Sequence, residues 1–206
     1  MKANLAKVTG KLLFAASLFF LFSGNAFAQW HPTIGVKGGL NVDNLSSSPV
    51  LGSNMGVYFA IEKGEEYGFG VEAFHAERYW QGAGNTATRI AYAEVPVRFE
   101  YFFLRKYTTI RPKVMIGPSF NFLLENDKMY SPGSAPAKFE FAGIIGVGFN
   151  KDLTKNGNIS MFFDARYMHG FTTTFATERE GLPANYNRTL RFHVGVGFSL
   201  SGGRKK

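Results

Sequence analysis

The chain lacks cysteine altogether among its 206 residues. Without thiols it cannot form disulfides, bind metals through thiolates, use a cysteine nucleophile or carry a lipid on cysteine. Charged residues are also scarce at 18%, although the formal net charge is +8. The cations are scattered, apart from a short Arg-Lys-Lys run at the C-terminus, so this charge does not predict nucleic-acid binding.

Long apolar runs are missing, with one exception near the N-terminus. Three lysines flank or precede the run Leu12–Phe22, which is followed by "SGNAFAQ" and its small-residue site Ala26–Ala28. This order predicts a secretory signal peptide at residues 1–28, cleaved after Ala28, and a mature domain at residues 29–206. A membrane anchor is the alternative, but a spanning helix needs about 20 apolar residues and this run has 11.

Sequence motifs of enzymes and metal sites are absent as well. The four histidines, at positions 31, 75, 169 and 193, show no metal-ligand spacing, and no nucleophile-elbow, Walker or dinucleotide-binding pattern occurs. The two Gly-Val-Gly triplets, Gly146–Gly148 and Gly195–Gly197, lie in strand-like sequence. We therefore predict no catalytic, cofactor-binding or metal-binding residue, and no cofactor.

What the chain does contain is period-two alternation of apolar and polar residues, with 24 glycines and 16% aromatic residues. A tilted β-strand crosses a bilayer in roughly 9–11 residues, and eight segments of about that length or longer alternate in this way. They are Thr33–Val42, Asn54–Glu62, Gly68–Trp80, Arg89–Phe103, Ile110–Leu124, Phe139–Asn150, Asn158–His169 and Arg188–Leu200. This pattern predicts an all-β fold, an eight-stranded antiparallel transmembrane β-barrel in up-and-down meander order.

The connections between these segments run long, short, long, short in turn along the chain. Outer-membrane barrels have short periplasmic turns and longer external loops. With the N-terminus in the periplasm the first connection is external and long, which fits the order in this sequence. A soluble sandwich has no reason to alternate its connections in this way.

The two faces of the predicted strands differ in chemistry. One face carries large apolar residues, and the other mixes charged, small polar and glycine residues. A soluble barrel would alternate equally, with the apolar face enclosed, so alternation does not separate the two architectures. The export signal, the glycines on the polar face and aromatic residues near the ends of the apolar face favour the membrane barrel. These aromatic residues are Tyr101, Phe103, Phe139, Phe149, Tyr167 and Phe198.

The polar face carries as many cations as acids. The cations are Lys37, Arg98, Arg111, Lys113, Arg166 and Arg191, and the acids are Glu62, Glu72, Glu94, Glu100, Glu140 and Asp164. An eight-stranded barrel is only wide enough to be filled by its own side chains, and unpaired buried charge is costly. We therefore predict a structural ion-pair network that plugs the lumen. A catalytic carboxylate pair is the alternative. With six acids among as many cations, however, two acids that could act as general acid and base are expected by chance and do not indicate catalysis.

A proline interrupts the segment "YAEVPVRFEYFF", Tyr92–Phe103. Proline donates no ladder hydrogen bond, and a closed barrel has no free edge to accommodate it. We predict a bulge or locally broken pairing at Pro96, and the same at Pro112 and Pro118 on the next segment.

Five stretches occur in order: "GVKGGLNVDNL", "YAEVPVRFEYFF", "RPKVMIGPSFNFLL", "FAGIIGVGFN" and "LRFHVGVGFSL". Together they resemble the PorT-like outer-membrane β-barrel family, which is related in architecture to small OmpX/OmpA-type barrels. The resemblance implies insertion by the outer-membrane assembly machinery, and no known activity for most members. One branch supports a secretion system for surface proteins, but nothing in this sequence assigns the chain to it. The C-terminus departs from the expected aromatic end, because Phe198 is followed by "SLSGGRKK".

From these features we expect a protein of the cell outer membrane that contacts lipid and has a structural or interaction role. Its external loops would bind any envelope protein partners. One alternative is a narrow pore for solutes or ions, and another is an accessory component of a surface-protein secretion system. A lipid-modifying enzyme is the least favoured, since it needs a Ser–His–acid set on the lipid-facing rim and the alternation places none there.

Overall fold

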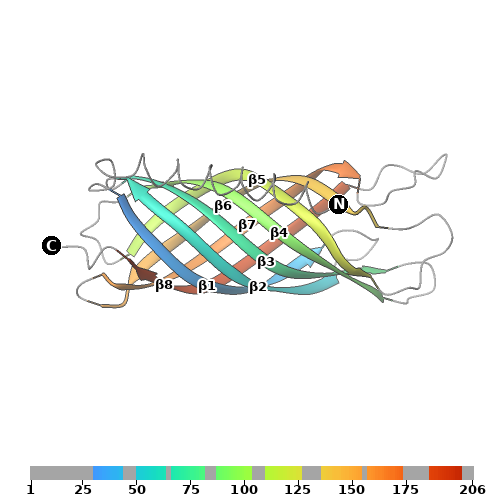
Figure 1. Ribbon diagram of the computed structural model, residues 1–206, viewed down its shortest axis with the longest axis horizontal. Coiled ribbons are helices and arrows are strands. Elements are labelled where there is room, and N and C mark those ends of the chain that lie inside the picture. Colours follow the sequence, from blue (N-terminus) through green and yellow to red (C-terminus); the bar gives the residue numbers. More distant parts are fainter. Residues whose placement is uncertain are drawn as a thin grey trace, which may run out of the picture.

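A computed structural model describes residues 30–43, 50–63, 66–81, 87–103, 110–126, 136–154, 157–173 and 186–200. These residues form eight antiparallel strands that close into one barrel in sequence order (Figure 1). The strands are β1 (Trp30–Asp43), β2 (Val50–Lys63), β3 (Tyr67–Gln81), β4 (Ala87–Phe102), β5 (Ile110–Asn126), β6 (Phe139–Asp152), β7 (Ile159–Thr173) and β8 (Tyr186–Ser199). The predicted fold class and meander order are confirmed. In the described part of the chain, no helix has the length and apolar character needed to span a membrane.

The barrel has two ends, which we name by the chain. The terminal end is where β1 begins and β8 finishes, and the loop end is the opposite one. The strands run further toward the loop end than predicted: β2 already begins at Val50, and β7 continues to Thr173. Because β3 and β4 also extend, the connection 82–86 is shorter than the connection 103–109. The predicted strict alternation of long and short connections is therefore wrong at that point.

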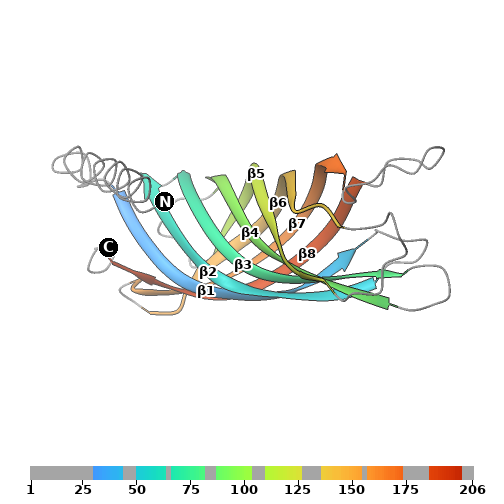
Figure 2. The same ribbon diagram turned by 45° about the vertical axis from the view of Figure 1, so that its right-hand side comes forward.

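The strands are strongly staggered around the barrel. One row of paired residues starts at Pro32 and returns to β1 at Val42, ten residues nearer the loop end (42 − 32). The row passes in order through Pro32, Ile61, Phe69, Phe99, Ile116, Ile145, Tyr167, Leu190 and Val42. Such a stagger requires strands that tilt across the barrel axis, and Figures 1 and 2 show this tilt. Every cross-strand row therefore climbs toward the loop end from β1 to β8.

The wall of the barrel is apolar outside and polar inside. Large apolar side chains face outward with much of their surface exposed, for example Val36 at 58% and Met55 at 69%. The alternating residues point inward and are buried, and most of the large polar ones are charged. A water-soluble barrel would have the reverse arrangement, whereas a lipid-facing barrel requires this one.

Glycines on the inner face make room for aromatic rings. A side chain at Gly35 or Gly197 would overlap the ring of Tyr58, and one at Gly195 would overlap the ring of Phe162. Tyr58 and Phe162 pack edge to face with ring centroids 4.7 Å apart. The two Gly-Val-Gly triplets lie within β6 and β8. The small residues therefore follow from the narrow lumen.

The ladder around Pro96 is interrupted, as predicted. Among the described pairs of β3 and β4, none joins Pro96 to β3, although the register is unchanged on either side. Between β4 and β5, Pro96 pairs with Ser119, but the described ladder then skips Val97 and Arg98 opposite Pro118. The prediction is thus confirmed at Pro118, which lies opposite the skipped Val97. The ladder between β5 and β6 runs unbroken through both Pro112 and Pro118, so the break at Pro118 is confined to its β4 side. At Pro112 the Phe103 N–H still donates to the proline carbonyl, so that part of the prediction is wrong.

Candidate functional site: the ion-paired lumen

The twelve charged residues predicted for the polar face all lie inside the barrel. None is more than 6% exposed. Each makes at least one ion pair with another charged side chain of the interior. The pairs fall into a central cluster, a loop-end cluster and a terminal-end pair, which we describe in turn.

The central cluster crosses the lumen. The Lys37 ammonium of β1 donates to Glu72 of β3 at 2.6 Å and to Asp164 of β7 at 2.8 Å. Arg166 donates to both acids as well, at 3.0 Å and 2.6 Å. Strands on opposite sides of the barrel are thus joined through its interior.

Strands β4 and β5 complete the central cluster. Arg98 donates to Glu100 at 2.7 Å, and its guanidinium lies 3.3 Å from Glu72. The Lys113 ammonium contacts Glu100 at 2.8 Å and Asp164 at 3.2 Å. The cluster therefore holds four cations and three acids and carries a net charge of +1. Buried charges of this kind are tolerated only when paired and hydrogen-bonded.

The loop-end cluster is the counterpart of opposite sign. Arg78 bridges Glu94 and Glu140, the latter at 2.9 Å, and Arg191 forms a second pair with Glu94. Two neutral residues of β8 extend this network. Asn187 donates to Glu140 at 2.6 Å, and the Thr189 hydroxyl donates to Asp43 at 2.7 Å. Two cations and three acids give this cluster a net charge of −1.

The terminal end is closed by one ion pair and an aromatic ring. Arg111 of β5 donates to Glu62 of β2 at 2.8 Å. The same guanidinium lies 4.1 Å from the centre of the Phe102 ring. A cation over an aromatic face is attracted by the ring quadrupole, most strongly where water is excluded. All three side chains are buried.

Two members of the interior were missed by the sequence analysis. Arg78 and Asp43 are both buried, which makes seven cations and seven acids among the described interior residues instead of six and six. Arg78 lies on the same face of β3 as Glu72, so the alternation of the sequence could have placed it in the interior. Asp43 lies one residue beyond the predicted strand Thr33–Val42.

A less charged layer separates the central and loop-end clusters. Phe74 lies two residues beyond Glu72 along β3, and His193 lies two residues before Gly195 along β8. Their rings are tilted against each other with centroids 5.1 Å apart. Neither ring nitrogen of His193 has a hydrogen-bond partner among the described residues. Within those residues, no three His, Asp or Glu side chains are grouped so that they could hold a metal ion.

The outer rim at the loop end holds a second, smaller set of polar residues. Arg89 donates to Glu77 at 2.5 Å and to Glu125 at 3.2 Å. The ladder between β2 and β3 runs unbroken past His75, which therefore faces outward, and it places Ser53 opposite Glu77. Ser53, His75 and Glu77 thus lie together on the rim, which corrects the sequence-based view that no such set occurs there.

The hydrogen bonds of this rim set differ from those of a catalytic triad. In a triad the histidine contacts the nucleophile and the acid orients the histidine. Here the Ser53 hydroxyl donates directly to Glu77 at 3.5 Å, and Glu77 is held by Arg89. The rim is therefore organised as an ion-pair set.

Comparison with known sequences covers β1 to β7. Residues 18–176 match the family described as outer membrane protein beta-barrel domain. The chain belongs to this family. A comparison with curated protein sequences gives no match.

Solved structures support the same fold. Neisserial surface protein A (NspA) is 13% identical, with a TM-score of 0.58 over 84% of this chain and 97% of its own. OprG from Pseudomonas aeruginosa is 10% identical, with a TM-score of 0.53 over 83% of this chain and 95% of its own. At such low identity the likeness concerns the fold alone. The protein is an eight-stranded outer-membrane β-barrel.

Proposed function

We propose that this barrel is a structural or interaction protein of the outer membrane with a plugged, charge-balanced lumen. The observation that carries the proposal is the central cluster, in which Lys37 reaches across the interior to both Glu72 and Asp164. A conducting path would have to pass through this cluster, the Phe74–His193 layer and the loop-end cluster. The loops then remain as the part of the protein that can recognise a partner.

Three other roles remain as alternatives to test. A narrow pore for solutes or ions would need the buried pairs to separate, and each separated buried charge is costly. An accessory role in a surface-protein secretion system, without catalysis, is the role of one branch of the PorT-like barrels. An enzyme acting on lipid would have to use the rim set around Glu77, whose hydrogen bonds are those of an ion-pair set.

The plugged lumen can be tested by cysteine accessibility, because the chain has no cysteine of its own. Ser119→Cys places a thiol in the interior, where Ser119 is fully buried, and Ser53→Cys places the matched control on the exposed rim. In folded barrels reconstituted into vesicles, we expect a membrane-impermeant thiol reagent to label the Ser53 variant and to leave the Ser119 variant unlabelled. Equal labelling of both variants would mean that the lumen is open to water and would overturn the proposal.

The proposed interaction role can be tested by photo-crosslinking in cells. A photo-reactive residue at Leu51 lies at the loop end of β2, and one at Phe198 lies at the terminal end of β8, both well exposed. We expect a discrete crosslinked envelope protein from the loop end alone. No protein crosslink from the loop-end position would contradict recognition at that end.

A further inference from the structure

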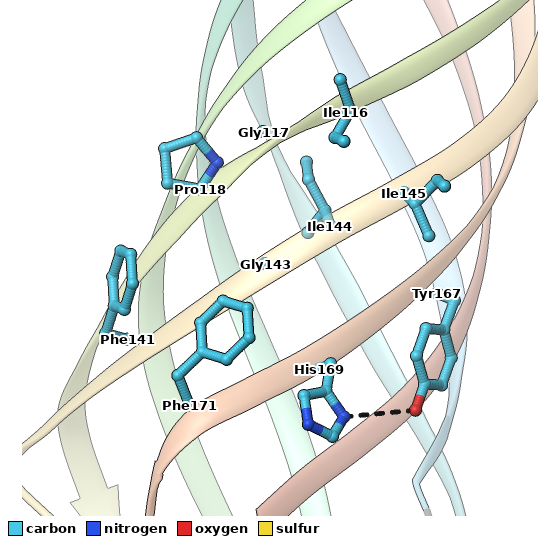
Figure 3. Close-up of a pocket in the computed structure, with 10 residues that line it drawn as sticks. All are labelled: Ile116, Gly117, Pro118, Phe141, Gly143, Ile144, Ile145, Tyr167, His169 and Phe171. Atoms are coloured by element: carbon cyan, nitrogen blue, oxygen red, sulfur yellow. Dashed lines mark hydrogen bonds between the residues drawn. The ribbon is translucent and has the colours of Figure 1, made fainter.

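The outer wall of the barrel has a hollow over strands β5, β6 and β7 (Figure 3). Its volume is about 400 Å³, and its lining is almost wholly apolar. Ile116 and Ile145 flank it toward the terminal end, and Phe141 and Phe171 flank it toward the loop end. The rings of these two phenylalanines pack against each other with centroids 5.6 Å apart.

The hollow exists because one outward position has no side chain. Gly143 alternates with the buried residues Ala142 and Ile144, so a side chain there would project outward. Its β-carbon would lie 3.0 Å from the ring of Phe171. Pro118 lies on one side of Gly143 in the ladder and His169 on the other. A larger residue at position 143 would therefore project into the hollow and crowd the Phe171 ring.

The row through Gly143 leads from the middle of the wall to the loop end. It runs through Pro118, Gly143, His169 and Arg188, and it climbs toward the loop end from β5 to β8. Pro118 lies in the middle of β5, whereas Arg188 is only two residues from the loop-end start of β8. A molecule that lies along this row would therefore have one part at the depth of lipid chains and another near the membrane surface.

At the loop end, the row through Gly143 is polar and cationic. Arg188 is exposed and faces outward directly beside His169. The His169 ring is held in place by a 3.4 Å hydrogen bond with the Tyr167 hydroxyl and by stacking on Tyr186. A guanidinium matches phosphate oxygens in geometry and charge.

We propose that the hollow is a seat for one acyl chain of a membrane lipid whose head group carries a phosphate, with Arg188 and His169 contacting that phosphate. Lipid chains offer the hollow no hydrophobic gain over the surrounding bilayer, so the preference comes from close packing and from the phosphate contact. The seat is thus selective for the head group and depends on the empty position at Gly143.

Native mass spectrometry of the folded barrel, released from micelles that contain dimyristoyl phosphatidylglycerol, tests the seat. We expect the wild type to retain one lipid, and Gly143→Leu to bind it about tenfold more weakly, equivalent to 1.4 kcal/mol. Gly38→Leu is the matched control, because Gly38 also faces outward from a strand and a β-carbon there makes only an ordinary 3.8 Å contact with the Asn54 backbone oxygen. This control should retain the lipid as the wild type does.

The head-group contact is tested separately. Arg188→Gln should weaken retention about fivefold, in line with a partly exposed ion pair, whereas Lys63→Gln at the terminal end should not. The comparison of Arg188→Gln with Lys63→Gln tests the phosphate contact even if Gly143→Leu fails to fold. An unheated gel would show whether the Gly143→Leu variant is folded. Inorganic phosphate alone should show no detectable binding, because the acyl chain of the lipid contributes to binding in the hollow.

Any of three results would overturn the proposal. The first is equal retention by wild type and a folded Gly143→Leu variant. The second is retention of phosphatidylglycerol by the Arg188→Gln variant that equals retention by the wild type. The third is a second copy of the chain on this wall in place of lipid, seen as a dimer that Gly143→Leu abolishes.

Discussion

Glu72→Gln is the substitution that probes the interior most sharply. The Glu72 carboxylate accepts hydrogen bonds from Lys37 and Arg166, and the Arg98 guanidinium lies 3.3 Å away. Removing its charge changes the central cluster from a net +1 to a net +2. The cluster is fully buried, so water cannot take over the role of the lost acid.

The expected cost follows from the burial of the pairs. Removing one partner of a buried ion pair costs about 3–5 kcal/mol, because the other charge is left uncompensated. The glutamine oxygen can still accept one hydrogen bond, so we expect the lower end of this range, about 3 kcal/mol. Glu77→Gln is the matched control on the same strand: Glu77 also pairs with an arginine, but its side chain is 25% exposed. Its loss should cost less than about 1 kcal/mol.

Urea unfolding of barrels reconstituted into lipid vesicles measures both costs. The folded fraction is read from the difference in gel mobility between unheated and heated samples. Adding Arg166→Gln to Glu72→Gln returns the cluster to a net +1, so the double variant should be more stable than additivity predicts, by about 0.5–3 kcal/mol. Equal effects of Glu72→Gln and Glu77→Gln, or strict additivity in the double variant, would refute a buried, mutually dependent network.

Three further predictions concern packing, pairing and processing. Gly195→Val should destabilise the barrel by about 1–3 kcal/mol because its side chain overlaps the Phe162 ring, whereas Gly38→Val should be near neutral; equal effects in urea unfolding would contradict the tight lumen. In hydrogen exchange of the folded barrel, the amide of Val97 should exchange faster than those of Val114 and Ile116, because the ladder between β4 and β5 skips Val97; equal protection would contradict the break. The mass of the protein from the outer membrane should correspond to a chain that begins at Gln29; retention of residues 1–28 would contradict the predicted cleavage, which lies outside the described residues.

The fold could be predicted from the sequence because a membrane barrel imposes a simple rule. Each strand must cross a layer of fixed thickness, and each residue faces either lipid or lumen. The twelve charged residues were assigned to one face by this rule alone. Strand ends were less predictable: the ladders continue past the segments in which apolar and polar residues alternate, as at Val50 in β2 and Thr173 in β7.

The partners within the lumen could not be predicted in the same way. Lys37 pairs with Asp164, 127 residues away, and this contact depends on the ten-residue stagger that accumulates around the barrel. The alternation gives the face of a residue but not its height relative to the other strands. The same holds for the hollow beside Gly143, which needs Pro118 on one neighbour and His169 on the other.

The most direct test of the plugged lumen is electrical. Folded protein is added to a planar lipid bilayer at neutral pH, and the current is compared with that of lipid alone and of heat-unfolded protein. We predict no unitary conductance steps above these controls, because the charged side chains described in the interior are buried and paired with one another across the lumen. Reproducible steps from the folded wild type would show a continuous water path and would contradict the account.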